Sequence, residues 1–493
     1  MRPPPVILSG HGLTPAEIVR IARDGAKVEI AAAVTGHLAA ARAVVERLAD
    51  GDQPVSDVAA HQRRALQARA VGMGPPLPVD VVRAMMAARA AGLAAGGSGA
   101  SPAVLEALVA ALNAGLTPMV PSLGSIGAGD LAPLSHMALS LIGEGGAEVG
   151  GVMLIGMSAF EAAGLAPLAL GSNDGIALIG ANALTVGQGA LALADAAGAL
   201  DALDAAVALS LEGFRGNLAI LDPRGQQARP APGQLEAAAR LRDLLGGSSL
   251  WRPGAARRLQ DPFSFRCAAT VHGAVLWALV EAGSAIEIEL NAAADSPLVL
   301  GEEMISTANF HLPQLALAFE ALGLGLAQAA QMSVERIKRL MSPPMTGLPM
   351  HLTPQAPSRS GFGAIQKTAV HLFSEIRRLA QPLLLDGSAV TEATEDHATM
   401  APGIVAKTAA LAAHVQRLAA IELMVAAQAV DLRHPLELGA GTRIAYDLVR
   451  SFMPYLDEDG PTGPNAERLA EALRSGGLRI SHLLGGLPAL GQR

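Results

Sequence analysis

Residues Pro121–Met137 read Pro-Ser-Leu-Gly-Ser-Ile-Gly-Ala-Gly-Asp-Leu-Ala-Pro-Leu-Ser-His-Met. The segment Gly124–Pro133 within this stretch is rich in glycine and turn-prone, and apolar residues flank it on both sides. Its polar side chains, Ser125 and Asp130, are costly in apolar surroundings unless they are paired or have a functional task. A glycine-rich turn alone is usually only a turn, so the rest of the chain decides what this segment does.

Four further polar clusters interrupt otherwise apolar sequence. They are Gln260-Asp261 with Ser264 and Arg266, Asn291 with Asp295, Asn309-Phe310-His311, and Glu395-Asp396-His397. Each has an ordinary structural explanation, because buried arginines pair, Asn and Asp cap helices, and charged runs begin solvated helices. The clusters therefore gain meaning only from their combination and order.

The composition places the chain among large folded proteins. It has 493 residues, of which 51% are hydrophobic and 16% charged, whereas disordered chains are poor in aliphatic residues and rich in charge. The net charge of −8 disfavours a nucleic-acid partner held by phosphate contacts. The single cysteine, Cys267, cannot form an internal disulfide, so we expect a cytoplasmic location.

Several chemistries lack their sequence signatures. The chain has no His-Glu-x-x-His, Cys-x-x-Cys, Gly-x-x-x-x-Gly-Lys-Ser/Thr or Gly-x-Ser-x-Gly motif, so we expect no metal, nucleotide or serine-hydrolase site. The uncharged run Gly175–Ala194 has spanning length, but its glycines and polar residues such as Asn182 weaken a membrane interpretation. No export signal opens the chain, and we expect a soluble protein with no membrane partner.

Long Ala/Leu-rich stretches dominate the sequence from Asp195 onward. Their apolar positions recur at three- and four-residue intervals, which predicts helices. The predicted helices are Asp195–Glu212, Gln234–Leu245, Ala268–Asn291, Leu312–Met341, Gly363–Leu385, Gly403–Leu432 and Arg443–Met453. Helices that are apolar nearly all round must be buried on most sides, so we expect a bundle that also associates with copies of itself.

The N-terminal part has shorter elements and is predicted to be a smaller mixed domain. Thr14-Pro15-Ala16-Glu17 predicts a helix start with a capping box, and Ser101-Pro102 predicts a second capped start, before a helix that Gly115 ends. The strand candidates are Lys27–Ile30, Val152–Ile155 and Pro297–Leu300, and Asp50–Ser56 is a predicted loop. We therefore expect an active-site domain, residues 1–195, followed by the helical bundle and C-terminal helices, residues 196–493.

Taken in order, the motifs resemble those of the histidine and aromatic amino-acid ammonia-lyase family, in the fumarase/aspartase-like superfamily, along nearly the whole chain. The matching segments are Pro121–Met137, Leu141–Gly145, Ser210–Gly216, Asp222–Arg224, Arg229–Gln234, Gln260–Cys267, Val271–Gly273, Asn309–His311, Ser360–Phe362 and Glu395–Met400. The resemblance implies a mainly α, elongated helical-bundle fold and a homotetramer whose active sites combine loops from several subunits. It also implies a carbon–nitrogen lyase of amino-acid degradation that acts on a small-molecule amino acid.

The chain departs from the family where the family's prosthetic group forms. In the family an Ala-Ser-Gly tripeptide condenses into an electrophilic methylidene-imidazolone, and the β-carbon of the serine becomes its methylene. Here the stretch reads Gly127-Ala128-Gly129-Asp130, with no serine between Ala128 and Gly129, and Ser125 lies upstream of the site. We therefore expect no methylidene-imidazolone and no other cofactor in this chain.

Other family residues are also replaced. The region that corresponds to the family's tyrosine loop, about Gly51–His61, is shortened and holds no tyrosine. In the segment that the family writes Leu-Asn-Gly-Thr-Gln, the usual asparagine is Gly180, and Asn182 follows two residues later. The tyrosine of the family's Gln-Asp-x-Tyr-Ser-x-Arg motif is Phe263, and a histidine that contacts the substrate ring in the histidine enzymes aligns with Arg69.

The resemblance also assigns roles to residues that are retained. Arg266 matches the arginine that binds the substrate carboxylate, and Glu395 matches a glutamate suited to hold a ring or the amine, or to move a proton. The remaining substrate-binding candidates are Asn309, Phe263, Phe362, Asn182 and His397.

Arg69 and Lys367 look like added cations, and with Glu395 they are the catalytic candidates. Lys367 lies in the apolar run Gly363–Leu372. A lysine there is either paired, or has a lowered pKa and a task, or packs its stem and exposes its ammonium group.

The missing electrophile narrows the reactions that the pocket can support. Ammonia is a poor leaving group, whereas a quaternary ammonium leaves as a neutral amine without prior protonation. Ergothionase, which resembles this family, lacks the electrophile and eliminates trimethylamine from ergothioneine. We therefore favour an electrophile-independent 1,2-elimination of a trimethylamine-like amine from a histidine-derived amino acid. Two alternatives stay open: a histidine or aromatic amino-acid ammonia-lyase, and a non-catalytic homologue that acts as a binding or partner subunit.

Overall fold

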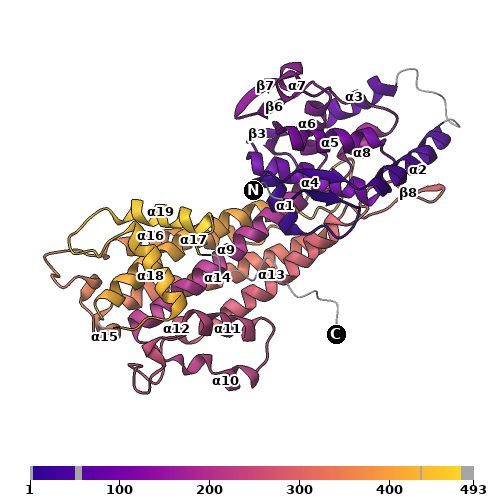
Figure 1. The fold of residues 1–493 in the computed structure, drawn as a ribbon. Helices are drawn as coiled ribbons and strands as arrows, with labels where there is room; N and C mark the ends of the chain where they lie inside the picture. Colours follow the sequence, from indigo (N-terminus) through magenta and orange to yellow (C-terminus); the bar gives the residue numbers. More distant parts are fainter. Residues whose placement is uncertain (1–3, 50–57, 434–435, 479–493) are drawn as a thin grey trace. The chain divides into compact units, whose positions relative to one another are not determined.

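The computed structural model describes residues 4–49, 58–433 and 436–478 (Figure 1). The described chain forms two compact units. Unit 1 runs to Ala194 and also takes in Gly283–Leu317 and Pro382–Ala406; unit 2 holds Asp195–Ala282, Ala318–Gln381 and the residues from Lys407 onward. The two later segments of unit 1 belong to the 196–493 bundle in the sequence-based division. They join unit 1 because packing, and not sequence order, decides which unit the end of a long helix belongs to.

Unit 1 is a mixture of short strands and helices. Its elements are β1 (Val6–Leu8), α1 (Pro15–Arg23), β2 (Val28–Ile30), α2 (Ala32–Ala49), α3 (Val58–Arg69), β3 (Met73–Pro76), α4 (Val79–Ala95), α5 (Pro102–Ala114), β4 (Leu116–Pro118), β5 (Pro121–Leu123), α6 (Leu131–Leu141), β6 (Gly146–Val149), β7 (Val152–Ile155), α7 (Met157–Ala163), α8 (Asp174–Ile179), β8 (Leu298–Leu300) and β9 (Glu303–Ile305). The three predicted strands are confirmed as β2, β7 and β8. The predicted loop Asp50–Ser56 lies outside the described residues, as does most of the region 51–61.

The strands of unit 1 form small separate sheets. β1 pairs in parallel with β2, with Val6 opposite Val28, and β4, β6 and β7 form an antiparallel three-stranded sheet in that order. β3 pairs with β5 and β8 pairs with β9, both antiparallel. Helices dominate the contacts, for example between α1 and α4 and between α3 and α6. The small sheets therefore connect neighbouring helices, and they do not form a central layer of unit 1.

The two predicted helix starts differ in how they are capped. At α1 the capping box is confirmed: the Glu17 amide donates to Thr14 Oγ1 (3.4 Å), and the Thr14 amide donates to Glu17 Oε2 (2.9 Å). Helix α5 begins and ends as predicted, with Gly115 in the left-handed conformation (φ 76°), but Ser101 does not cap it. The Ser101 hydroxyl donates instead to Asp174 Oδ2 (3.0 Å), because a buried carboxylate competes for that hydrogen.

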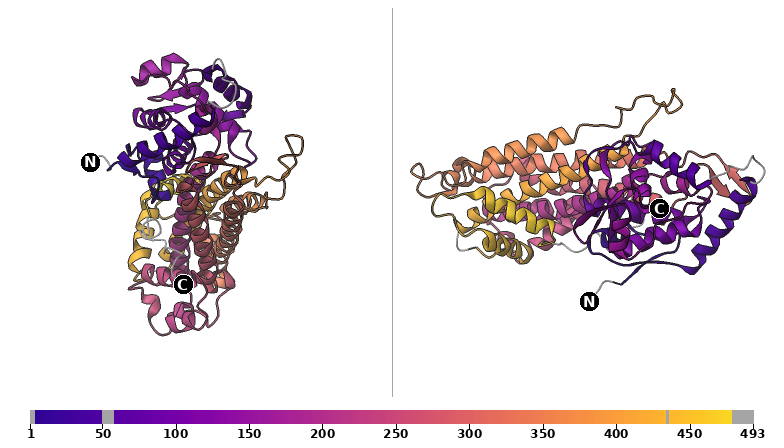
Figure 2. Two further views of the ribbon diagram at one scale, coloured as in Figure 1. Left: turned by 90° about the vertical axis from the view of Figure 1, so that its right-hand side faces the viewer. Right: turned by 90° about the horizontal axis from the view of Figure 1, so that it is seen from above.

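Unit 2 is built almost entirely of helices (Figure 2). Its elements, some of which begin or end in unit 1, are α9 (Ala183–Phe214), η1 (Leu218–Leu221), α10 (Pro223–Gln227), α11 (Gln234–Leu244), η2 (Ser249–Trp251), α12 (Phe263–Arg266), α13 (Ala268–Leu290), α14 (Pro313–Leu340), α15 (Pro343–Thr346), η3 (Met350–Leu352), α16 (Ile365–Leu379), α17 (Ala401–Asp431), α18 (Ala440–Phe452) and α19 (Thr462–Arg474). All seven predicted helices are present. The stretch predicted as Gly363–Leu385 is shortened to α16, and α19 was not predicted.

Small residues and buried ion pairs, among them Arg336–Glu422, hold the helices of unit 2 together. A Cβ added to Gly213 on α9 would lie 2.8 Å from the Cβ of Ala429 on α17, so glycine permits this close approach. Glu422 on α17 accepts hydrogen bonds from Arg336 on α14 (Nη2–Oε2, 2.9 Å) and from Ser210 on α9 (2.7 Å). Glu422 and Arg336 are fully buried, which such an ion pair tolerates because each charge is paired.

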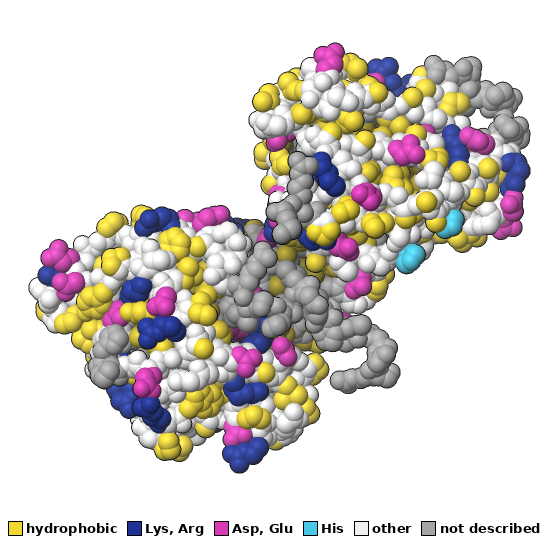
Figure 3. Space-filling view, in the orientation of Figure 1, with side chains coloured by type: hydrophobic (Ala, Val, Ile, Leu, Met, Phe, Trp, Pro, Cys, Tyr) yellow, Lys and Arg dark blue, Asp and Glu magenta, His cyan; other side chains and the backbone are white. Residues whose placement is uncertain are grey.

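In the described chain, four helical segments are long and apolar enough to cross a membrane by length and composition, and half or more of the apolar window of each is buried inside the protein. They are Asp174–Phe214, Ala268–Leu290, Pro313–Leu340 and Ala401–Asp431. The uncharged run singled out in the sequence lies within the first of them. The face of the molecule in Figure 3 shows positive and negative side chains interspersed with apolar ones. Within unit 2, polar groups such as Glu422 also lie on these helices.

Candidate active site

The glycine-rich loop of unit 1 is organised around the side chain of Asp130. Ser125 Oγ donates to Asp130 Oδ1 (2.8 Å), and the Thr185 amide at the start of α9 donates to Asp130 Oδ2 (2.8 Å). The Gly127 amide donates to Ser125 Oγ (3.3 Å), so this serine closes the turn. Asp130 is fully buried, and burial raises the pKa of its carboxyl although these hydrogen bonds act to lower it. Both polar residues of the loop therefore hold its shape.

The segment Thr399–Met400, distant in sequence, is hydrogen-bonded to this loop. The Met400 amide donates to the carbonyl oxygen of Ile126 (2.9 Å), and Thr399 Oγ1 donates to the carbonyl oxygen of Gly127 (3.0 Å). Gly127 has φ 82°, and a Cβ there would lie 2.3 Å from Thr399 Oγ1. Only glycine therefore fits at this position, and the loop and the segment Glu395–Met400 form one structure.

A third segment joins the cluster through His311. Ala128 and His311 form an isolated antiparallel β-bridge, and His311 Nε2 lies 2.8 Å from His397 Nδ1. Asn182 donates from Nδ2 to the carbonyl oxygen of Phe310. The side chain of Asn309 is turned toward the preceding segment, where its Nδ2 donates to the carbonyl oxygen of Ala293 (3.2 Å). Unit 1 thus brings together the loop residues Gly127, Ala128, Gly129 and Asp130 with Asn182, Asn309 and His397.

Two of the catalytic candidates also belong to unit 1. Glu395 is half-buried, and its backbone pairs with Val390 (amide to carbonyl 2.9 and 3.3 Å), two residues before His397. Arg69 ends α3, where its Nη1 donates to the carbonyl oxygen of Ala65 on the same helix (3.0 Å). In the described part of the chain neither side chain forms an ion pair, so both are available to a charged ligand.

The remaining candidates lie in unit 2. On the short helix α12, Phe263 is 72% exposed and Arg266 is exposed as well, whereas Phe362 is fully buried. Lys367 lies on the exposed side of α16, whose residues Ile365, Ala369 and Ile376 take the buried side. The burial cost expected for Lys367 from its apolar run therefore does not arise in this chain, because helical periodicity turns it away from the buried side. Among the described residues neither Arg266 nor Lys367 has an ion-pair partner.

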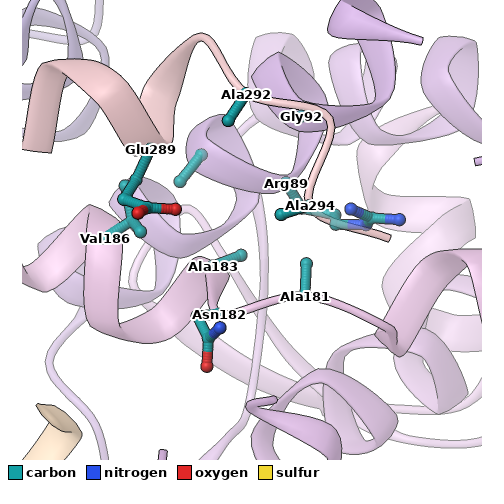
Figure 4. Close-up of a pocket in the computed structure, with 10 residues that line it drawn as sticks. Arg89, Gly92, Ala181, Asn182, Ala183, Val186, Glu289, Ala292 and Ala294 are labelled. Atoms are coloured by element: carbon teal, nitrogen blue, oxygen red, sulfur yellow. The ribbon is translucent and has the colours of Figure 1, made fainter. Parts of the chain in front are cut away.

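A small pocket beside Asn182 contains a carboxylate that the sequence analysis did not single out. Arg89, Asn182 and Glu289 line the pocket together with small residues, among them Gly92 and Ala181 (Figure 4). Its hollow of about 20 Å³ has room for one water molecule. Burial raises the pKa of Glu289 to about 7. The sequence signal is weak, since a glutamate on an apolar helix normally marks its solvent side.

Two buried polar atoms of this pocket have no hydrogen-bond partner among the described residues, Arg89 Nε and Asn182 Oδ1. Arg89 is otherwise neutralised, because its Nη2 donates to Asp295 Oδ1 (2.7 Å) in a buried ion pair. The pocket therefore combines hydrogen-bonding groups with a carboxyl that is close to half-protonated at neutral pH.

The loop does not fit the methylidene-imidazolone that the ammonia-lyase resemblance would call for. The group needs a serine β-carbon between Ala128 and Gly129, which are joined directly, and Ser125 is engaged with Asp130 and Gly127. The backbone of the loop is nevertheless held by Thr399 and Met400. In residues 4–49, 58–433 and 436–478, no group of three or more His, Cys, Asp or Glu side chains could hold a metal ion.

Comparisons with known proteins agree over almost the full length. Residues 13–451 match the family model described as aromatic amino acid lyase. The chain is 38% identical to the histidine ammonia-lyase of Gloeobacter violaceus over 495 residues, which cover 96% of both chains. It is 40% identical to the histidine ammonia-lyase of Symbiobacterium thermophilum over 490 residues, which cover 95% of this chain and 96% of that relative. The crystal structure of ergothionase from Treponema denticola, in complex with desmethyl-ergothioneine sulfonic acid, superposes with a TM-score of 0.92 at 31% identity and covers 97% of this chain and 100% of that one.

Proposed function

The chain belongs to the aromatic amino acid lyase family and is a carbon–nitrogen lyase with the mainly α fold of the ammonia-lyases, and from this premise we propose that it eliminates an amine without a built-in electrophile. The proposed substrate is a histidine-derived amino acid with a quaternary ammonium group, such as ergothioneine. The proposed products are an α,β-unsaturated acid and a tertiary amine such as trimethylamine.

One observation carries this proposal: the loop keeps its anchoring but lacks the residue that makes the electrophile. Ala128 is joined directly to Gly129, yet Thr399 and Met400 still hold the loop at Gly127 and Ile126. A decaying site would be expected to lose such contacts. A retained site without an electron sink suits a substrate whose leaving group needs no activation.

The leaving group supplies the physical reason. A quaternary nitrogen already carries the positive charge that its bond electrons neutralise on departure, so it leaves as a neutral amine. The remaining tasks are to bind the carboxylate, to take the β-proton and to stabilise charge that builds on the ring or its sulfur. The likeness to the Treponema denticola ergothionase structure supports this choice.

The charged candidates are assigned to these tasks as follows. Arg266 or Lys367 binds the carboxylate by charge-assisted hydrogen bonds. Arg69 or Lys367 stabilises negative charge on the heterocycle, and Glu395 holds the ring or serves as the base. Asn182, Asn309, Phe263 and His397 complete the substrate-binding wall, which the fully buried Phe362 supports from inside the fold.

We further propose that the protein is a cytoplasmic homotetramer with active sites shared between subunits, without a cofactor and without nucleic-acid or membrane partners. Exposed apolar side chains in the segment that carries Arg266, such as Phe263 (72%) and Leu259 (87%), support such sharing. Contiguous exposed apolar patches, rather than single exposed side chains, mark surfaces that a partner covers.

The second candidate is histidine ammonia-lyase activity, which the 40% and 38% identities to two histidine ammonia-lyases favour. The two functions differ in leaving group and in their need for the electrophile.

The deciding experiment is to incubate the purified protein separately with ergothioneine, other trimethylammonium amino acids and histidine. Trimethylamine release together with a new conjugated ultraviolet chromophore would support the proposal. Ammonia from histidine would support the second candidate. Silence on every substrate would overturn both and favour a binding or partner subunit.

A further inference from the structure

His311 and His397 form a hydrogen-bonded imidazole pair beside the glycine-rich loop. His311 Nε2 lies 2.8 Å from His397 Nδ1, with the ring centroids 4.9 Å apart and the ring planes at 62°. We propose that this pair is the acid–base device of the elimination and takes the β-proton of the substrate. The inference rests on the proposed function and makes this pair the base in place of the family's tyrosine, which leaves Glu395 to hold the ring.

The hydrogen bond between the rings determines what the pair can offer. A neutral imidazole has one N–H and one lone pair, and the shared contact uses the N–H of one ring and the lone pair of the other. If His397 donates, its Nε2 keeps a lone pair and His311 Nδ1 carries a hydrogen; if His311 donates, the two ends exchange roles. In either tautomer the neutral pair presents one general base and one hydrogen-bond donor.

The backbone holds this pair at the loop. His311 is bridged to Ala128, the residue next to which the family's serine is missing. His397 lies two residues before Thr399, whose hydroxyl holds Gly127. His311 is half-buried and His397 exposed, so a small substrate can reach the pair.

The surroundings favour the neutral form of His311. Burial, and then the charge of His397, lower the pKa of His311 below its ordinary value, so this ring resists protonation before substrate binds. The other titratable groups on the segments that meet here are Asp130 on the loop, and Glu395 and Asp396 before His397.

The proposed step is balanced. The lone pair of one imidazole nitrogen takes the β-proton, and the electrons of the Cβ–H bond become the Cα=Cβ double bond. The Cα–N bond breaks, and its electrons leave with nitrogen as a neutral tertiary amine. The pair is left with one extra proton and one positive charge, which it returns to water after the products leave.

The test uses variants that keep the hydrogen bond between positions 311 and 397 but replace one imidazole by a group that cannot take up a proton. The side-chain amide of glutamine can replace the Nε2 of His311, and that of asparagine can replace the Nδ1 of His397. For His311→Gln and His397→Asn we expect kcat for trimethylamine release to fall by about 10²–10⁴-fold, with KM nearly unchanged and without the rise of rate with pH that we expect for the wild type. His37→Asn, at an exposed histidine of α2, is the matched control and should retain full activity.

The outcomes separate this inference from the proposed function. If the wild type releases trimethylamine but both variants keep its kcat and pH profile, the pair is not the base and the elimination still stands. If the variants change only KM, the pair binds substrate and the inference is also overturned. If the wild type releases no amine, the proposed function fails and the inference fails with it.

A second measurement does not depend on the folding of a variant. Proton NMR of the wild-type histidine ring C–H groups across pH should place the pKa of His311 below that of an ordinary histidine. A pKa of His311 at or above the ordinary histidine value would contradict the neutral state proposed for this ring before substrate binds.

Discussion

Thr399 Oγ1 donates a hydrogen bond of 3.0 Å to the carbonyl oxygen of Gly127, a residue 272 positions earlier in the chain. The contact is buried, and the Ala401 amide in turn donates to the same hydroxyl (3.3 Å). One side chain therefore connects the glycine-rich loop to the start of α17, which makes it a sensitive point for both stability and activity.

Replacing Thr399 by valine should destabilise the protein by about 1–3 kcal/mol, because a buried carbonyl and a buried amide lose their partner. The free energy of unfolding in urea measures this, and lyase activity should fall with it. Thr399→Ser keeps the hydroxyl and is the control. Equal stability of the valine variant and the wild type would contradict the anchoring role.

Glu289 should make stability depend on pH near neutrality. Its folded-state pKa is raised from the ordinary 4.5 to about 7, so its contribution to stability is present below pH 4.5 and is lost as the pH rises to about 7. Glu289→Gln should therefore be more stable than the wild type at pH 8, by on the order of 1–3 kcal/mol, and nearly equal to it at pH 4.5.

Urea unfolding at several pH values from 4.5 to 8 measures this difference. Glu287→Gln, at an exposed position on the same helix, is the matched control and should leave the pH dependence as in the wild type. A constant difference between Glu289→Gln and the wild type at all pH values would argue against a buried, titrating carboxyl.

Arg266→Ala should lower kcat/KM for the amino-acid substrate without unfolding the protein. The side chain is exposed and has no ion-pair partner in the described chain, so its removal costs little stability. A charge-assisted hydrogen bond is worth about 1.5–3 kcal/mol, which corresponds to a fall of roughly 10–150-fold. Steady-state kinetics and a melting curve check both halves, and full activity would remove the carboxylate-binding role.

Arg336→Met should destabilise the protein by about 3–5 kcal/mol, because it leaves the fully buried Glu422 without its counter-charge. Adding Glu422→Leu should restore much of that loss, since the unpaired charge is then gone. By contrast, Arg224→Ala removes an exposed partner of Asp222 and should leave the stability nearly unchanged, because water screens this pair. Denaturant unfolding of the three variants measures these changes in stability. A loss in Arg336→Met no larger than that in Arg224→Ala would contradict the prediction.

Much of the fold could be predicted from local patterns. The capping box at Thr14, the end of α5 at Gly115 and the long helices follow from residues that are neighbours in the sequence or one helical turn apart. The prediction that Ser101 caps α5 was wrong because its hydroxyl donates to Asp174 instead. Asp174 is distant in sequence and becomes a neighbour of Ser101 only after folding. Lys367 shows the same limit of local patterns. The composition around it suggested an apolar environment, but its position on the helical turn of α16 places it on the exposed side.

The candidate site could be predicted only as separate pieces. Its segments were found by their polar residues, but nothing local places His397 against His311, 86 positions earlier, or identifies Glu289 as a pocket residue. The family resemblance supplied roles for single residues, whereas hydrogen bonds to the loop came from the structure.

The sequence by itself determined the helices, the family and the absence of a serine between Ala128 and Gly129, because these depend on covalent order and short-range periodicity. Only the tertiary structure decided that Thr399 holds Gly127, that two histidines share a hydrogen bond beside Ala128, and that Glu289 is buried enough to titrate near neutral pH. Hydrogen bonds and desolvation depend on which distant segments meet, and that is settled by packing of the whole chain.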